Sequence, residues 1–126
     1  MTDKELIAMA RQAAENAYVP YSHFSVGAAL LDKNGNVHLG CNIENASYGA
    51  TNCAERTAIF SAVAQGIKEF EKIAIVCDKT GYPYPCGICR QVMSEFMPDA
   101  EVLIADENDN IKRYTVRQLL PEIFVL

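Results

Sequence analysis

The sequence predicts an α/β domain in which helices cover both faces of a mixed five-stranded sheet, a three-layer α/β/α sandwich. The chain has 126 residues, a length that suits one domain. After an opening hairpin, helical and strand patterns alternate, which favours helices on both faces of the sheet. Ile73–Cys77 is a short, continuous apolar run, typical of a strand buried on both sides. We therefore expect residues 1–126 to form a single domain with the order α-β-β-α-β-α-β-β-α.

The first half of the chain begins with a helix and a hairpin. Thr2 and Glu5 match a capping box, and apolar residues at helical spacing predict a helix over residues 3–17. Asn34-Gly35 is a strong hairpin turn signal. The strands on either side of it are expected at Phe24–Leu31 and Val37–Cys41.

The second half alternates helices with strands. A polar loop over residues 42–51 leads to a helix from about Cys53 to Gln65, where Gly66 is a natural stop. A turn-rich loop over Thr80–Pro85 leads to a third helix that begins near Cys86 and ends before Pro98. The remaining elements are a strand at Val102–Ala105, a turn at Asp106–Asn110, a strand at Ile111–Tyr114 and a final helical turn capped by Thr115.

Composition excludes several classes of function. The net charge is −5, and basic residues never form a run longer than two, so the cationic stripe of a polynucleotide-binding protein is missing. No apolar run approaches the roughly 18 residues of a membrane span, and the N-terminus lacks the pattern of a signal peptide. We expect a cytoplasmic protein with a small-molecule ligand and without nucleic-acid or membrane partners.

Five cysteines, an odd number, argue against a disulfide framework in a reducing compartment and favour thiol or metal chemistry. Cys86-Gly-Ile-Cys89 is a C-x-x-C pair at a predicted helix start, and Cys53 lies 33 positions earlier at another. Two helix N-termini would then aim three thiols at one point. Cys41 and Cys77 fall in predicted strands and are expected to be small core residues.

The chemistry of this trio favours zinc. Thiolates bind Zn²⁺ at about 2.3 Å, and helix N-termini lower thiol pKa values. Three thiolates and one Zn²⁺ leave one negative charge, which helix dipoles and Arg56 can offset. Three protein ligands leave a fourth position for water, as in catalytic zinc sites. Glu55, two residues after Cys53, can reach that water as a general acid and base.

These residues carry a family resemblance. Cys53-Ala-Glu55 followed by Pro85-Cys86-Gly-Ile-Cys89 is the three-cysteine form of the zinc-deaminase pattern, H-x-E and P-C-x-x-C. The chain resembles the small, homotetrameric cytidine deaminases of nucleoside salvage over nearly its whole length. Further matching segments are Pro20-Tyr-Ser22, Phe24-Ser-Val-Gly-Ala-Ala-Leu30, Gly40-Cys-Asn-Ile-Glu-Asn-Ala46 and Leu119-Leu-Pro-Glu-Ile-Phe124.

The resemblance implies hydrolysis of cytidine and deoxycytidine to uridine and deoxyuridine plus ammonia, with one Zn²⁺ per subunit. Zinc-bound hydroxide would attack C4 of the cytosine ring, and Glu55 would carry protons to N3 and to the leaving amine. Asn42 and Glu44 would hold the ribose, Phe24 would pack near base and sugar, and the Ala54 backbone would bind the base. Ala46, Tyr48 and Phe124 would complete the site of a neighbouring subunit.

Two alternatives remain open at this stage. The same scaffold could deaminate a related cytosine compound, such as a blasticidin-type nucleoside or a nucleotide; Asn42-Ile-Glu44 favours an unphosphorylated ribose, because Glu44 would repel a phosphate. The chain could instead be a non-catalytic zinc-stabilised binding module, with Cys41, Cys77 or a histidine as the fourth ligand. His23 and His38 lack metal-ligand spacing and are expected to be structural or exposed.

Overall fold

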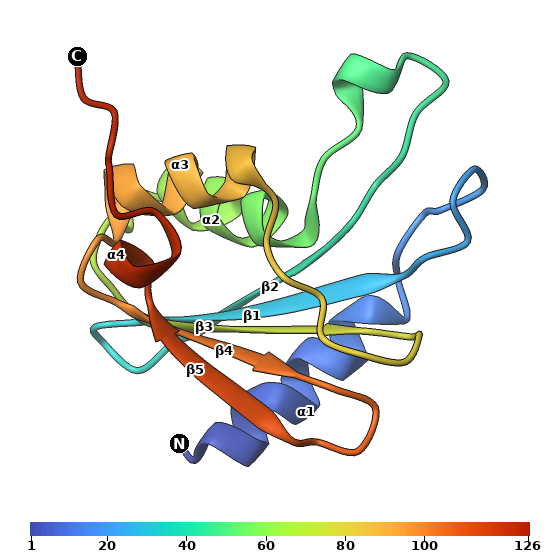
Figure 1. Cartoon of the computed structure of the whole chain (residues 1–126), viewed down its shortest axis with the longest axis horizontal. Coiled ribbons are helices and arrows are strands. Elements are labelled where there is room, and N and C mark those ends of the chain that lie inside the picture. The colour runs from blue at the N-terminus through green and yellow to red at the C-terminus, as the bar shows by residue number, and fades with distance from the viewer.

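Five strands form one mixed sheet in the order β2-β1-β3-β4-β5, in a computed structural model that describes all of residues 1–126. Helices lie above and below this sheet, as predicted (Figure 1). The strands are β1 Val26–Asp32, β2 Val37–Cys41, β3 Phe70–Cys77, β4 Glu101–Ala105 and β5 Ile111–Thr115. The helices are α1 Asp3–Ala14, α2 Ala54–Ala64, α3 Gly87–Phe96 and α4 Val116–Leu119, with a short 3₁₀ turn η1 at Tyr48–Ala50.

The pairing pattern places β3 at the centre of the sheet. β1 pairs antiparallel with both β2 and β3, whereas β3 and β4 are parallel and β4 and β5 are antiparallel. A parallel pair needs a crossover connection, and α3 supplies it between β3 and β4. The sheet is therefore mixed, and the predicted order of elements is confirmed.

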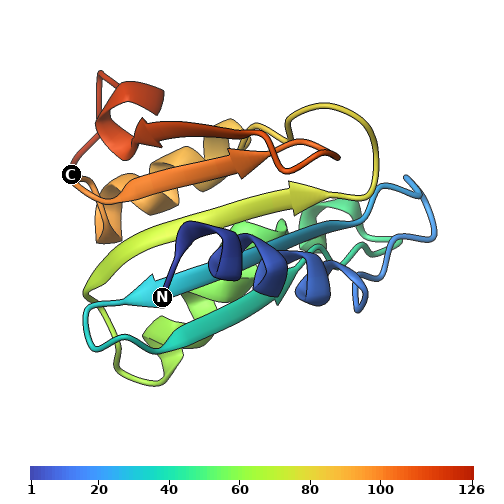
Figure 2. The ribbon, with the colours of Figure 1, turned by 90° about the horizontal axis from the view of Figure 1, so that it is seen from below.

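Helix α1 covers one face of the sheet by itself (Figure 2). Its apolar side packs on alternate residues of the central strands, because successive side chains of a strand point to opposite faces. The buried cluster on this face consists of Leu6, Ile7, Ala10, Ala29, Leu31, Ala74, Val76, Leu103 and Ala105. Thr2 forms the expected capping box with Glu5 at the start of the helix.

Helices α2 and α3 cover the opposite face, where the larger part of the core lies (Figure 1). The strand residues that point away from α1 include Leu30, Ile73 and Ile75. They pack on this face against Ala58, Ile59 and other helix residues. Gly40 allows α2 to approach β2 closely, since a Cβ at this position would lie only 2.3 Å from the carbonyl oxygen of Ala54. The start of α2 is thus held directly against the sheet.

Several predicted boundaries differ from the observed ones. Helix α1 ends at Ala14 rather than at residue 17, because the N–H groups of Asn16 and Ala17 bond to carbonyls three residues back and form a turn. Strand β1 begins at Val26 instead of Phe24, and β3 extends back to Phe70. None of the four helices combines the length and the apolar character that crossing a bilayer requires.

Candidate metal centre and active-site cavity

Three thiols meet between the starts of α2 and α3. The Sγ atoms of Cys53, Cys86 and Cys89 all lie within 4.8 Å of one another, and those of Cys53 and Cys86 are 3.7 Å apart. No other histidine, cysteine or acidic side chain joins this set. The sequence prediction that these three residues come together is confirmed, and the fourth protein ligand of a purely structural zinc site is not found.

The two helices present these thiols from their N-termini. Cys53 is the N-cap of α2 and Cys86 the N-cap of α3, and Cys89 lies one turn further into α3. The Sγ of Cys86 accepts a hydrogen bond from the backbone N–H of Cys89 at 3.5 Å. Free N–H groups and the positive end of each helix dipole therefore face the sulfur cluster and stabilise thiolates there.

The donor set fits zinc. Four ligands at the corners of a tetrahedron, with Zn–S bonds of about 2.3 Å, place two sulfurs about 3.8 Å apart. The observed Cys53–Cys86 separation of 3.7 Å matches this value without rearrangement. Three thiolates are soft ligands of the type that select zinc over magnesium or calcium. Cys53, Cys86 and Cys89 would hold the ion.

Arg56 supplies the positive charge that three thiolates require. Its Nη2 donates to the Sγ of Cys53 at 3.1 Å, and its Nε donates to the Sγ of Cys89 at 3.4 Å. One rigid guanidinium thus bridges ligands from two different helices. This arrangement agrees with the expectation that Arg56 offsets excess negative charge.

The surroundings of Cys53 and Cys89 shift the pKa values of these two thiols in opposite directions. Interaction with the neighbouring Cys89 thiol, together with the Arg56 guanidinium, lowers the pKa of Cys53 to about 5 despite the opposing effect of burial. The same interaction, together with burial, raises the pKa of Cys89 above its usual range. The Cys53 thiol is therefore biased towards the thiolate form that a divalent metal ion binds.

A cavity of about 370 Å³ opens beside the thiols. The predicted site residues that line it are Phe24, Asn42, Cys53, Ala54, Glu55 and Cys86. Its volume lies in the range of small-molecule sites. The structure therefore brings the proposed acid–base residue, two metal ligands and three substrate-binding candidates to one hollow.

Glu55 is the buried acid of this cavity. Its side chain is only 4% exposed although it belongs to the first turn of α2. Burial raises the pKa of Glu55 to about 7, and the Cys53 thiolate adds to this, because the backbone N–H of Glu55, the Cys89 thiol and Arg56 lower the pKa by less. A carboxyl group with a pKa near neutrality can both accept and return a proton at physiological pH.

Asn42 and Phe24 are fixed to each other. The Asn42 Oδ1 accepts from the N–H of Val26 at 2.9 Å, and its Nδ2 donates to the carbonyl of Phe24 at 2.7 Å. The amide keeps one N–H and one lone pair for another partner. Asn42 is only 9% exposed and lines the cavity. Its side chain therefore also holds the start of β1 beside the cavity.

The other predicted substrate residues do not line this cavity within one chain. One carboxylate oxygen of Glu44 accepts from the N–H groups of Tyr21 and Ser22 at 3.0 and 3.1 Å, and Glu44 lines a separate hollow with Tyr48. Ala46 is exposed, as are Tyr48 at 78% and Phe124 at 64%. The loop that carries Ala46 and Tyr48 and the C-terminal tail extend from opposite ends of the α2–α3 side in Figure 1.

One wall of the cavity was not predicted. Tyr82, Pro83 and Tyr84, together with Val26, complete its lining. In the sequence the three loop residues are part of a turn-rich connection, and proline and glycine nearby indicate only irregular structure. Two tyrosines within three residues, directly before the metal-binding C-x-x-C, are the signal that could have identified this wall.

Other sequence signals have structural roles. Cys77 is buried, as expected, Cys41 is half-buried, and neither approaches the metal cluster. Cys53 is the N-cap of α2, and the Asn52 side chain donates to Thr57 Oγ1 at 3.1 Å. Glu55 is thus free of a capping role.

Comparison with known proteins places the chain in a family. Residues 1–105 match the family model described as "Cytidine and deoxycytidylate deaminase zinc-binding region". A cytidine deaminase of Sporosarcina psychrophila is 49% identical over 125 residues, which cover 98% of this chain and 92% of the relative. A blasticidin-S deaminase of Bacillus cereus is 34% identical over 131 residues, covering 94% and 89%.

A solved structure agrees with the sequence comparisons. The crystal structure of cytidine deaminase from Burkholderia pseudomallei superposes with a TM-score of 0.94 at 50% identity, and covers 98% of this chain and 100% of that one. The fold that the sequence predicts is therefore shared with a known cytidine deaminase. The chain belongs to the cytidine and deoxycytidylate deaminase family of zinc-binding proteins.

Proposed function

We propose that this chain hydrolyses cytidine and deoxycytidine to uridine and deoxyuridine, with release of ammonia. The observation that carries the proposal is one cavity lined by a buried Glu55 and by two thiols of the zinc centre, Cys53 and Cys86. Similarity to cytidine deaminases over nearly the whole chain supports the choice of substrate. Zinc, when bound, supplies the Lewis acidity that lowers the pKa of water towards neutrality.

Glu55 moves the protons of the reaction. It takes one proton from the attacking water and delivers it to N3 of the cytosine ring as the new C4–O bond forms. It then carries the proton of the new C4 hydroxyl to the amino group; the C4–N bond breaks as the C4=O bond forms, and ammonia leaves. Its pKa of about 7 suits both directions of transfer. Arg56 remains bound to the thiols and offsets their charge throughout.

We propose that the substrate is held by Phe24, Asn42, Glu44 and the backbone of Ala54. Phe24 packs against the base and the sugar, and the backbone of Ala54 forms a hydrogen bond with the base. Asn42 and Glu44 hold the ribose hydroxyls. The free N–H of Asn42 and the second carboxylate oxygen of Glu44 remain for this purpose.

The site is completed, in this proposal, by neighbouring subunits of a homotetramer. Ala46, Tyr48 and Phe124 would reach into the cavity of another copy. The exposure of Tyr48, Phe124 and the following Val125 and Leu126 supports this arrangement, because such side chains favour burial. Light scattering of the purified protein would give four chains per particle; a monomer with full activity would contradict it.

The whole chain would then act as one deaminase domain in the cytoplasm. Five free cysteines support a reducing compartment. The single centre of chemistry, with thiols from two helices and a carboxylate from one of them, supports treating residues 1–126 as one unit.

A substrate panel tests the proposed function. Loss of cytosine absorbance would be followed for cytidine, deoxycytidine, cytidine monophosphate and blasticidin S, with zinc measured on the same sample. Cytidine and deoxycytidine should be turned over best. The 34% identity to a blasticidin-S deaminase makes that compound the second candidate. Preference for the monophosphate or for blasticidin S would contradict the proposal.

A further inference from the structure

The unpredicted wall of the cavity stands on a loop that has no regular structure of its own. Residues 78–86 connect β3 to α3, and Tyr82, Pro83 and Tyr84 of this loop line the cavity beside Cys86. Tyr84 is about half exposed. A loop of this kind orders its side chains only when other elements hold it, because fixing each residue costs backbone entropy.

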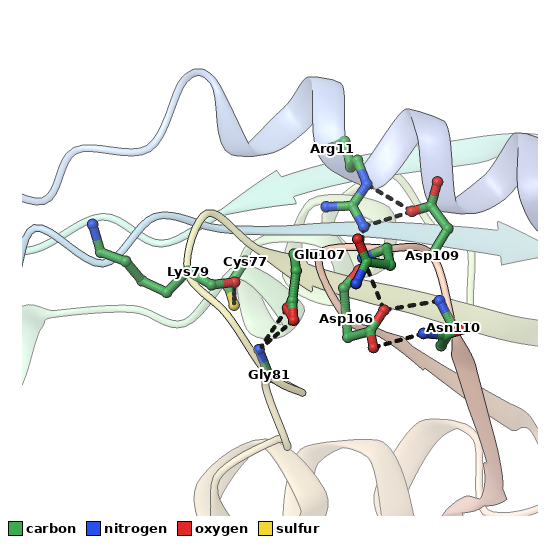
Figure 3. A network of polar contacts seen from close by, with 9 residues as sticks. Arg11, Cys77, Lys79, Gly81, Asp106, Glu107, Asp109 and Asn110 are labelled. Carbon is green, nitrogen blue, oxygen red and sulfur yellow. Dashed lines mark hydrogen bonds and ion pairs between the residues drawn. The ribbon is translucent and has the colours of Figure 1, made fainter.

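The first tie is made to the backbone of the loop. The carboxylate of Glu107, in the β4–β5 turn, accepts from the N–H of Gly81 at 3.1 and 3.3 Å (Figure 3). Gly81 has a φ of +93°, a conformation that glycine adopts without strain. Glu107 therefore fixes the bend at which the loop turns towards the cavity.

The second tie is made to the aromatic wall itself. Lys112 of β5 donates from Nζ to the hydroxyl of Tyr84 at 2.6 Å, and its ammonium lies 4.5 Å from the centre of the Tyr82 ring. Tyr114, two residues further along the same strand, meets Tyr84 edge to face at 6.4 Å. Alternate residues of a strand share one face, so Lys112 and Tyr114 together support Tyr84.

Lys112 has no competing carboxylate. None of the ion pairs of the chain includes it. Its ammonium is instead shared between the phenol oxygen of Tyr84 and the face of the Tyr82 ring, a hydrogen bond combined with a cation–π contact. The charge of this lysine is thus directed at the wall of the cavity.

The turn that carries Glu107 is itself anchored. The Asp106 carboxylate accepts from the backbone N–H groups of Asn108 and Asn110 and from the Asn110 side chain (Figure 3). Arg11 of α1 donates to the carbonyl of Asp106 and to the carboxylate of Asp109. The β4–β5 hairpin is therefore attached to the helix on the far face of the sheet.

We propose that the β4–β5 hairpin clamps the β3–α3 loop, with Lys112 as the main positioning residue and Glu107 as the second. The clamp fixes Tyr82 and Tyr84 as a preformed wall that holds the nucleoside in the cavity. This role rests on the proposed function, whereas the clamp itself rests on the contacts alone. Because the wall contacts substrate and transition state alike, its loss raises KM and leaves kcat nearly unchanged.

Lys112→Met tests the clamp, since methionine keeps the length of the side chain and removes the donor and the charge. Hydrogen exchange of the peptide covering residues 79–85 should become faster, and KM for cytidine should rise about tenfold with kcat within about twofold. Lys112→Arg should restore most of both properties. Lys4→Met, the same change at an exposed position of α1, serves as the matched control and should alter neither.

Two further variants separate the ties. Tyr84→Phe removes only the hydroxyl that Lys112 bonds and should raise KM by less than Lys112→Met, and it replaces that variant if Lys112→Met does not fold. Glu107→Ala should speed exchange at Gly81 with about a twofold rise in KM. Zinc per chain is measured throughout, so that an effect on KM at full loading is separated from loss of metal.

The outcomes distinguish the clamp from the proposed function. Unchanged exchange over residues 79–85 in Lys112→Met, at wild-type zinc content, would overturn the clamp. Faster exchange with KM and kcat both unchanged would overturn the positioning role. If the wild-type protein does not deaminate cytidine, the proposed function fails, and the exchange experiment still decides whether the hairpin holds the loop.

Discussion

The chain buries two carboxyl groups, Asp32 and Glu55, and their surroundings move their pKa values in opposite directions. Asp32, at the end of β1, accepts from the N–H groups of Asn34 and Asn36 and pairs with Nε2 of His38 at 2.9 Å. The His38 hydrogen bond and the backbone donors lower the pKa of Asp32 against the effect of burial. For Glu55 burial prevails and the pKa rises.

The difference shows that partners, and not burial alone, decide what a buried acid does. Three donors keep Asp32 ionised, so it stabilises the β1–β2 turn and has no proton to exchange near neutrality. Glu55 stands against a cavity and a cluster of thiols, where its ionised form is poorly stabilised. A buried carboxyl group whose ionised form lacks partners lowers the stability of the fold, but it can carry protons in catalysis.

The largest expected effect is on turnover. Glu55→Gln keeps the shape of the side chain and removes the proton carrier, so kcat for cytidine should fall about 10²- to 10⁴-fold while zinc stays near one ion per chain. The matched control is Asp32→Asn, the same chemical change at the other buried acid. It should retain most of the turnover. Comparable activity of Glu55→Gln and wild type would end the assigned role of Glu55.

The second effect is on stability, which should fall as the pH rises because folding raises the pKa of Glu55. The folded chain holds the Glu55 proton more tightly than the unfolded chain, whose value is near 4.5. The stabilisation is complete below that pH and is lost as the pH rises through about 7. Between these two pH values the free energy of unfolding of the metal-free wild type, measured in urea, should fall by roughly 3 kcal/mol relative to that of Glu55→Gln. A constant difference between the two proteins would contradict the burial argument.

Asp32 should show the opposite dependence. Its pKa is lowered by folding, so its stabilisation is present above the unfolded value of 3.8 and is lost as the pH falls through the lower, folded value. Asp32→Asn should therefore melt below wild type at neutral pH, with a gap that closes in acid. Thermal unfolding followed by circular dichroism measures this, and a gap that persists unchanged in strong acid would refute the assignment.

The smallest effect concerns one donor of Asp32. His38→Ala leaves the two backbone N–H groups in place, so the melting temperature should fall less than in Asp32→Asn and the acid unfolding midpoint should move to higher pH. His38→Gln, which keeps a side-chain donor, should recover part of the loss. Equal losses in His38→Ala and His38→Gln would mean that the ring contributes packing and not the hydrogen bond.

Residues with local signals could be predicted from the sequence. The capping box of Thr2 and the spacing of Cys86 and Cys89 depend on neighbours along the chain, and both were confirmed. The hairpin at Asn34-Gly35 was confirmed too, although the reason for its stability, the Asp32–His38 pair, was not foreseen. Such pairs depend on which side chains the pleat places on one face.

Contacts between distant segments could not be predicted. Nothing in the sequence near Tyr84 indicates that Lys112 will bond its hydroxyl, because this contact arises from the order β3-β4-β5 in the sheet. The early end of α1 likewise lets Tyr18 pair with Ile43, a residue distant in the sequence. The ligands of the metal were predictable because their chemistry is rare, whereas tyrosine and lysine occur in many roles.

The most direct test of the central claim is X-ray absorption at the zinc edge of the purified protein, since the account depends on three thiols that hold one ion and leave one position open. The account predicts three sulfur neighbours at about 2.3 Å and a single lighter neighbour. Four sulfur neighbours, or two sulfurs with two protein nitrogens, would contradict it.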